Sequence, residues 1–360
     1  MRPLTRDSVI AQAREIGFDL CGIARADVHP RLARMAAWIA QGRAGEMTYL
    51  AESLDERLDP RRVLPTARSV VSVAVVYNTA SSREAPTGEA AADSGRVAIS
   101  RYAWGDDYHD VLRTRLRALL IWMQQQAGPG FEAFSCVDAG PIQERVFAEQ
   151  AGLGWIGKHT GLINPQLGSW LFLGEILTNA DLEPDAPGVD QCASCTRCLD
   201  ACPTGAIVAP YELDATRCLS YLTIETRGAL SDAARVLVGA EIYGCDICQD
   251  VCPWNRRAAT SDDAAWQPRA PLASPTLVEL CRLSDEAWRE LLKGSAMRRA
   301  GLRRIRRTLA YATRHLPATS GRAARAELRS HASAAFPEVA DAIAWAEAVD
   351  GHDMFPIQTA

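Results

Sequence analysis

The stretch CASCTRCLDACPTG, residues 192–205, places four cysteines within eleven positions and follows the last one with a proline. This CxxCxxCxxxCP spacing is the one found in bacterial two-cluster ferredoxins. Three closely spaced thiolates can surround one iron–sulfur cube, while the proline turns the chain so that the fourth thiolate reaches a second cube. The spacing therefore predicts a domain that holds two [4Fe-4S] clusters.

A second cysteine group completes the ligand count. Cys245, Cys248 and Cys252 precede Pro253 and lack one cysteine of the first spacing, which Cys218 can supply. We expect two sets of four ligands: Cys192, Cys195, Cys198 and Cys252 for one cluster, and Cys202, Cys218, Cys245 and Cys248 for the other. A pair of zinc sites is the alternative, because CxxC pairs also bind zinc. Zinc has no need of a proline-flanked fourth cysteine that crosses over, so clusters are favoured.

The composition of the chain favours a globular protein of a reducing compartment. It has 360 residues, 48% of them hydrophobic, and eleven cysteines, too many to be read as a disulfide framework without an export signal. The N-terminus has no continuous apolar core, and the longest apolar runs are about half a membrane span. We expect a cytoplasmic monomer with no membrane partner. Cys21, Cys136 and Cys281 are expected to be buried thiols.

About 190 residues precede the cysteine groups and mix helical with strand-like patterns. Helices are expected over 5–18, 30–41 and 108–126, strands over 20–25 and 69–77, and a mobile loop over 78–96. Glycines at 140, 152, 154, 157 and 161 suggest close approach to a large flat cofactor. The GxGxxG spacing of residues 152–157 follows a helical stretch and lacks an acidic ribose ligand, so no Rossmann site is expected.

Asp138 stands out because it ends a strand-like run directly before AGPIQER, where a helix is expected to begin. A carboxylate at this place could donate a proton. It could equally be the N-cap of the helix, a frequent role of aspartate before a proline-led helix start. The residues alone leave both interpretations open.

The ordered motifs RLDPRRVLPTARSVV, ISRYAWGDDYHDVL, VDAGPIQER, GLGWIGKHT, CTRCLDACPTGAI, CLSYLTIE and IYGCDICQDVCPWN make the chain resemble the epoxyqueuosine reductases. The resemblance implies an α+β protein in three parts. A nitroreductase-like cobalamin-binding domain would take residues 1–185, a ferredoxin-like domain residues 186–260, and a HEAT-like helical repeat residues 261–360.

The resemblance also implies an oxidoreductase that reduces epoxyqueuosine to queuosine at the tRNA wobble position, the last step of queuosine synthesis. Cobalamin would be reduced by the clusters, which an external electron donor supplies. Asp138 falls on the aspartate of the family's VDxGPxxER motif and would be the general acid, with a pKa that we expect an apolar pocket to raise. The cobalamin contacts implied by motif matching are Arg57, Arg61, Ser100, Asp138, Lys158, Ser220 and Tyr221.

His109 is not expected to ligate cobalt. The cobalamin motif DxHxxG is broken in DYHDVL, where Leu112 replaces the glycine, so a structural role is expected for His109.

The C-terminal part carries a basic segment in a chain whose net charge is −5. Residues 289–329 contain twelve Lys or Arg and two Glu. A solvated helix with incidental charge is one interpretation. The resemblance favours tRNA binding by Arg298, Arg299, Arg303 and Arg304, and Arg306 and Arg307 are further candidates for phosphate contacts. Thr308 stands where the family would have asparagine.

Two other functions are compatible with the cysteine pattern. A corrinoid and iron–sulfur reductive dehalogenase would share both cofactors, but it would have no use for a basic C-terminal segment. A non-catalytic electron-transfer protein would share the clusters, but it would have no use for Asp138.

Overall fold

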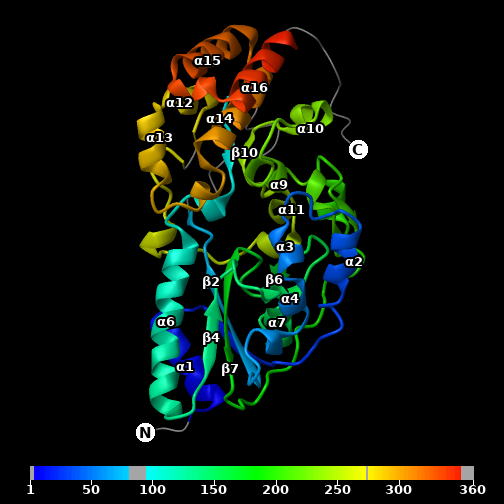
Figure 1. Ribbon diagram of the computed structural model, residues 1–360, viewed down its shortest axis with the longest axis vertical. Coiled ribbons are helices and arrows are strands. Elements are labelled where there is room, and N and C mark those ends of the chain that lie inside the picture. The colour runs from blue at the N-terminus through cyan, green and yellow to red at the C-terminus, as the bar shows by residue number, and fades with distance from the viewer. Residues whose placement is uncertain (1–3, 81–94, 273–274, 350–360) are drawn as a thin grey trace.

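The computed structural model describes residues 4–80, 95–272 and 275–349. A four-stranded antiparallel sheet of order β1-β2-β7-β4 forms the lower half of the molecule in Figure 1. Its strands are β1 (Leu20–Arg25), β2 (Ser69–Val76), β4 (Ala133–Cys136) and β7 (Leu171–Thr178). Every residue of β2 is buried, as expected for a central strand that is rich in valine.

Helices cover both faces of this sheet, which gives three layers (Figure 1). On one face lie α1 (Arg6–Ile16) and α6 (Tyr108–Ala127), which bury Val9 and Leu116 against Val73 and Ile176. On the other face lies α7 (Glu144–Gln150), whose Phe147 packs with the opposite side of the strands. The period-2 alternation of the strands sends alternate residues to these two cores.

Local signals set the ends of the helices. Thr5 and Ser8 form a capping box at the start of α1, and Gly17 ends that helix with φ 101°. Asp107 caps α6 by accepting a hydrogen bond from the main-chain N–H of His109. The start of α6 therefore lies at the end of the sheet where β4 also ends.

The cysteine-rich segment lies above the sheet in Figure 1. Its short elements are α8 (Arg197–Asp200), β8 (Ile207–Ala209), β9 (Glu212–Leu213), α9 (Leu219–Ile224), α10 (Asp232–Leu237), β10 (Glu241–Tyr243) and α11 (Ile247–Asp250). β10 pairs in parallel with β3 (Ala98–Ile99), so a segment from the N-terminal half joins the cysteine-rich part. Minor elements near the sheet are α2 (Arg34–Ala40), α3 (Tyr49–Glu52), α4 (Leu54–Leu58), β5 (Trp155–Ile156) and β6 (Leu162–Ile163).

A layer of helices forms the upper end of the molecule (Figure 1). Its members are α12 (Leu277–Arg282), α13 (Asp285–Leu292), α14 (Gly301–Ala312), α15 (Ala318–Ser330) and α16 (Pro337–Ala348). Their apolar faces share one core with Ile99, Leu222 and Ile242. The helical layer is thus continuous with the cysteine-rich part, and both include residues from the segment around β3.

The structure confirms most of the element predictions. The expected helices over 5–18 and 108–126 and the strands over 20–25 and 69–77 are present, while the helix expected over 30–41 is limited to Arg34–Ala40. Of the loop expected over 78–96, residues 81–94 lie outside the described residues. The main sheet is antiparallel, whereas a Rossmann site needs parallel strands, in agreement with the sequence analysis. Among the described residues, no helix is both long and apolar enough to span a membrane.

Candidate active site and cluster-binding segment

Asp138 lies two residues after β4, in a turn that is conformationally unusual. Its φ is +56°, in the left-handed region that residues other than glycine rarely adopt. The main-chain N–H of Ala139 donates to the carbonyl of Val137 at 2.5 Å, which closes a three-residue turn around Asp138. A turn of this kind costs roughly 1–3 kcal/mol and is found mostly at functional sites. The chain therefore presents the Asp138 carboxylate at the end of the sheet in a strained turn.

The helix expected to begin at AGPIQER starts later than predicted. α7 begins at Glu144, its N-cap is Gln143, and no side chain caps it. The N-cap interpretation of Asp138 is therefore wrong. The carboxylate is 60% exposed and remains available for chemistry.

Two neighbouring side chains of α6 hold the Asp138 carboxylate. Tyr108 Oη donates to Oδ2 at 2.7 Å, and His109 Nε2 lies 3.3 Å from the same oxygen. The other ring nitrogen of His109, Nδ1, lies 2.7 Å from Oδ1 of Asp107. His109 thus bridges two carboxylates, a role in the site that the sequence interpretation missed when it called this residue structural. The sequence Asp107-Tyr108-His109 at a helix N-cap was the feature from which this role could have been predicted.

These bonds decide the protonation of the site. Partial desolvation by the surrounding protein raises the pKa of the Asp138 carboxyl even though its side chain is 60% exposed, but hydrogen bonds from His109 and Tyr108 outweigh this effect and leave the pKa below its usual range. The raised pKa expected from the sequence is therefore wrong for this carboxyl. Burial lowers the pKa of His109, yet its bonds to Asp107 and Asp138 prevail and raise it to about 9. At neutral pH the proton of this group therefore resides on His109.

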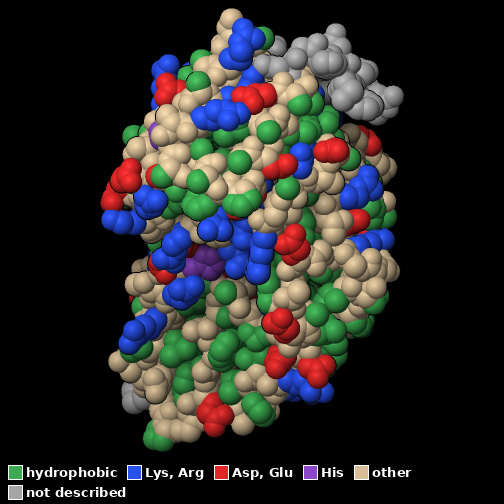
Figure 2. Space-filling view, turned by 45° about the horizontal axis from the view of Figure 1, so that its top comes forward, with side chains coloured by type: hydrophobic (Ala, Val, Ile, Leu, Met, Phe, Trp, Pro, Cys, Tyr) green, Lys and Arg blue, Asp and Glu red, His purple; other side chains and the backbone are tan. Residues whose placement is uncertain are grey.

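Basic side chains surround this carboxylate site. Figure 2 shows Lys and Arg side chains gathered around a histidine in a hollow of one face. Arg298 lies 3.9 Å from Asp107, and the charge of Asp138 contributes to the raised pKa of Arg299, after the larger effect of its hydrogen bond to Glu225. Two of the predicted tRNA-binding arginines thus lie at the rim of the Asp138 site.

The eight cysteines of the cysteine-rich segment gather in the two predicted groups. Burial and then the neighbouring thiols of Cys252, Cys192 and Cys195 raise the pKa of Cys198 to about 11. In the second group, burial and then the neighbouring thiol of Cys218 raise the pKa of Cys248, and Cys202 also contributes. Burial and then the charge of Glu241 raise the pKa of Cys245, with smaller effects from the thiols of Cys248 and Cys218. Cys198 also acts on Cys248, so the two groups are adjacent. None of the eleven cysteines forms a disulfide.

The GLGWIGKHT motif supports the first cysteine group. Nζ of the buried Lys158 donates to the carbonyls of Ala193 at 2.6 Å and Cys195 at 2.9 Å. Trp155 Nε1 donates to Cys192 Sγ at 3.5 Å. Lys158, predicted as a cobalamin contact, is thus engaged with the cysteine loop.

The other predicted cobalamin contacts are spread over several places. Ser100 donates to Asp246, between two cysteines of the second group, and Tyr221 Oη accepts from the main-chain N–H of Glu46 at 2.7 Å. Arg57 is buried and donates to Ser53 Oγ at 2.9 Å. Arg61 is exposed and paired with Asp59. Ser220 is half-buried in α9, next to Cys218.

The basic C-terminal segment divides into exposed and buried arginines. Arg298, Arg299 and Arg303 are exposed and Arg304 is half-buried, as phosphate contacts require. The side chains of Arg306 and Arg307 are fully buried, so the prediction that they contact phosphates is wrong. The physical reason is that α14 is buried on every side from Ile305 to Ala312, so both guanidinium groups bond to main-chain carbonyls of the neighbouring segments.

The glycines of the 152–161 segment are explained by internal packing. A Cβ on Gly154 would lie 2.1 Å from the carbonyl oxygen of Ile163, and one on Gly152 would lie 2.7 Å from that of Ala186. At these positions the protein's own main chain, and not a flat cofactor as predicted, comes close to the glycines.

Comparisons with known proteins agree with this arrangement. Residues 57–139 match the family model described as Epoxyqueuosine reductase QueG, DUF1730, and residues 191–255 match the 4Fe-4S double cluster binding domain. The chain is 40% identical over 340 residues to the epoxyqueuosine reductase of Xanthomonas campestris, with 94% of each chain covered.

Two solved structures are similar over most of the chain. An epoxyqueuosine reductase with a tyrosine tRNA stem loop modified with epoxyqueuosine has a TM-score of 0.85 and 33% identity, over 96% of this chain and 90% of that one. The Bacillus subtilis epoxyqueuosine reductase, with its aspartate catalytic loop swung out of the active site, has a TM-score of 0.83 and 33% identity, over 94% and 88%. The chain belongs to the epoxyqueuosine reductase family.

Proposed function

We propose that this protein reduces epoxyqueuosine in tRNA to queuosine. The reaction removes the epoxide oxygen as water and consumes two electrons and two protons. The observation that carries the proposal is the Asp138 carboxylate, which is solvent-accessible, held by His109 and Tyr108, and rimmed by Arg298 and Arg299. An aspartate catalytic loop in the Bacillus subtilis relative supports the same role for the Asp138 turn.

In this proposal the acid is the Asp138–His109 pair. His109 carries the proton on Nε2 at neutral pH, 3.3 Å from Asp138 Oδ2. Transfer across this bond protonates Oδ2, which then donates to the epoxide oxygen as its C–O bond breaks. Asp107 keeps the other ring nitrogen fixed and stabilises the charged imidazole at 2.7 Å. The lowered pKa of Asp138 is therefore compatible with acid catalysis.

Two [4Fe-4S] clusters, when bound, would supply electrons one at a time. The thiol groupings fit the ligand sets Cys192, Cys195, Cys198, Cys252 and Cys202, Cys218, Cys245, Cys248, and the match to a double-cluster domain supports them. Cobalamin, when bound, would supply a low-potential metal electron donor to the substrate. Arg57, Ser100, Lys158, Ser220 and Tyr221 are the residues proposed to lie around it, with Arg61 as the outermost candidate.

We also propose an assignment of the three structural units to known folds. The three-layered sheet supports a nitroreductase-like unit over residues 1–185, and the layer from α12 to α16 supports a HEAT-like unit over residues 261–360, on either side of the cysteine-rich unit over 186–260. The exposed Arg298, Arg299 and Arg303 and the half-buried Arg304 are proposed to bind the tRNA backbone near the Asp138 site. Transfer RNA as a partner is supported by the stem-loop complex of the solved relative.

The decisive experiment is an anaerobic incubation of the reconstituted protein with cobalamin, a chemical reductant and tRNA that contains epoxyqueuosine. Nucleoside mass spectrometry should show the loss of one oxygen atom. Asp138→Asn should retain the cluster absorbance and abolish the conversion. Conversion at the wild-type rate by Asp138→Asn would remove this residue from the mechanism, and no conversion by the wild-type protein would refute the function.

A further inference from the structure

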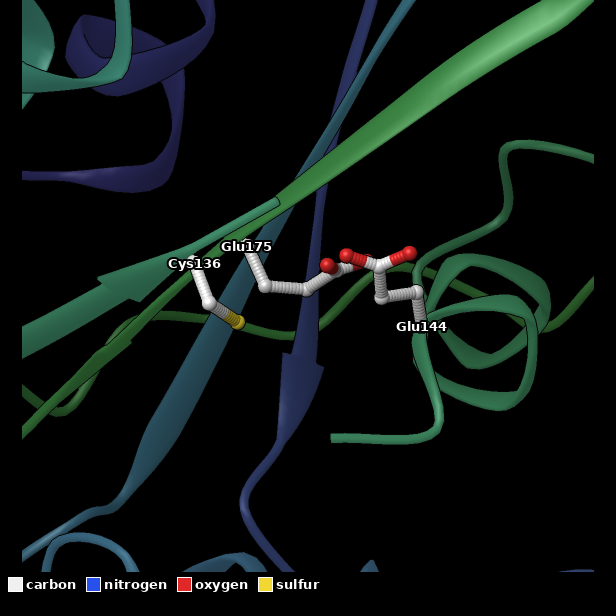
Figure 3. A group of neighbouring side chains, drawn as sticks. All are labelled: Cys136, Glu144 and Glu175. Atoms are coloured by element: carbon white, nitrogen blue, oxygen red, sulfur yellow. The ribbon is translucent and has the colours of Figure 1, made fainter. Parts of the chain in front are cut away.

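A second carboxyl pair lies behind the Asp138 turn. Glu175 in β7 faces α7 and is fully buried, and Glu144 is the first residue of α7. Figure 3 shows the two carboxyl groups pointing toward one another, with Cys136 beside Glu175 on the neighbouring strand. The ligand atoms of these three residues lie within 4.8 Å of one another.

Glu175 meets no hydrogen-bond donor that could stabilise it as a carboxylate. Both of its oxygens are buried and have no hydrogen-bond partner among the described residues. The group it points at is the Glu144 carboxyl, which is an acceptor itself (Figure 3). Arg145, the basic residue next to Glu144, directs its guanidinium to the carbonyl of Thr160 instead. An isolated buried carboxylate is costly, so this arrangement requires a proton between the two groups.

Glu144 connects this pair to the catalytic turn. Its Oε1 accepts a short hydrogen bond from the main-chain N–H of Asp138, the residue with φ +56°. This bond fixes the peptide that gives the turn its left-handed conformation. Because a strained turn persists only when its surroundings over-determine it, the orientation of Glu144 controls where the Asp138 carboxylate lies.

We propose that Glu175 is a proton-donating partner of Glu144, and that the pair is the positioning device that holds the Asp138 turn in its catalytic conformation. The inference rests on the proposed function of Asp138. The carboxylic acid of Glu175 donates to Glu144, and Glu144 in turn accepts from Asp138. Loss of the shared proton would place two negative charges side by side and release the turn.

The electrostatic surroundings agree with a proton held in the pair. Burial, and then the charge of Asp138, raises the pKa of Glu144 to about 8, and burial with the charge of Glu144 raises that of Glu175. The charged or titratable groups around the pair are Asp138, Arg145, Arg57, Cys136, Tyr108 and His109. No lysine or arginine among the described residues bonds to Glu175. The pair should therefore still hold a proton at neutral pH.

Two substitutions distinguish whether Glu175 acts as a hydrogen-bond donor or only fills space. Glu175→Gln keeps a donor toward Glu144 and cannot ionise, so it should retain most of the kcat at neutral pH. Glu175→Leu removes the donor and should lower kcat about a hundredfold, the scale of a 1 Å misplacement of a catalytic group. The KM for tRNA should be unchanged, because neither glutamate lies at the basic rim.

Infrared spectroscopy tests the proton without relying on turnover. At pH 7 the wild-type spectrum should contain the carbonyl stretch of a buried carboxylic acid that is lost in Glu175→Gln and kept in the control Glu183→Gln, whose carboxylate is exposed. An unchanged band in Glu175→Gln would overturn the proposal. So would equal activity of Glu175→Leu and the wild type, or a stoichiometric divalent metal that is lost in Glu144→Gln. If the wild type fails to reduce epoxyqueuosine, the function fails, while the band still reports on the pair.

Discussion

Replacing Arg307 by methionine should destabilise the helical layer without weakening the contact with nucleic acid. The Arg307 guanidinium is fully buried and donates to three main-chain carbonyls of α9 and the segment that follows it: Leu222 at 2.7 Å, Thr226 at 2.8 Å and Gly228 at 2.5 Å. It therefore ties α14 to the cysteine-rich part. Methionine fills much of the same space but offers none of these donors.

The expected magnitude follows from two opposing effects. Leaving three buried carbonyls without a donor costs about 2 kcal/mol each, or about 6 kcal/mol together. Removing the buried charge recovers part of this, because burial lowers the pKa of Arg307 from 12.5 to about 10, equivalent to about 3 kcal/mol. The net loss is about 3 kcal/mol, which corresponds to a population of locally opened molecules more than a hundredfold larger.

Hydrogen–deuterium exchange, read peptide by peptide under anaerobic conditions, measures this opening. Peptides from α9 and α14 should exchange about a hundredfold faster in Arg307→Met, while those from the sheet should not change. The control is Arg303→Met on the same helix, whose guanidinium is exposed and stacks 4.3 Å from the ring centre of Phe336. This variant should lose less than about 1 kcal/mol.

Binding of tRNA at several salt concentrations completes the comparison. Arg303→Met should reduce the slope of log affinity against log salt by about one, because one phosphate contact is lost. Arg307→Met should leave the slope unchanged. If Arg307→Met instead shows wild-type exchange and a reduced slope, Arg307 binds phosphate in solution and the buried assignment is wrong.

Three further results are expected. Turnover should fall as the pH rises through about 9, where His109 loses its proton, and His109→Gln should lack this decline in a kcat–pH profile. The contribution of protonated His109 to the folding free energy is fully present below pH 6.5 and is lost between pH 6.5 and about 9. Cys252→Ser should lower the iron content from about eight to about four atoms per chain, whereas Cys281→Ser should not change it. Lys158→Met should speed the bleaching of cluster absorbance by a chelator, since the carbonyls of Ala193 and Cys195 lose their donor, and exposed Lys293→Met serves as its control.

The cysteine groups and the long apolar elements could be predicted from the sequence because their signals are local. The ligand spacing around Cys198 and the valine-rich run over 69–77 each need only neighbouring residues to be read. The proximity of Cys252 to the first group is a long-range contact, and it agrees with the one arrangement of the ligand count that matched the ferredoxin pattern; the ligand assignment itself stays a prediction.

The roles of the arginines and of His109 could not be read in this way. Arg303 and Arg307 stand four residues apart and therefore lie on the same side of α14. Arg303 is in the first turn, which is still accessible, whereas the helix is buried on every side from Ile305 onward by segments distant in sequence. The role of His109 depends on β4 ending beside the start of α6, which brings residues 107 and 109 to Asp138 across about 30 positions of sequence. A Glu in the apolar run LFLGEIL was a readable sign of a buried carboxyl, but its partner Glu144 comes from a different element.

The protonation states around Asp138 form one connected system. On the solvent side, His109 holds a proton against Asp138 and keeps the carboxylate ionised until a substrate oxygen can accept the proton. On the buried side, the Glu144–Glu175 pair holds a proton that keeps the turn in place. The imidazolium of His109 loses its proton as the pH rises through about 9, whereas burial raises the pKa of both glutamates, so that their pair holds a proton at neutral pH. His109→Gln should therefore remove the alkaline decline of activity, whereas Glu175→Leu should lower kcat on the neutral plateau itself.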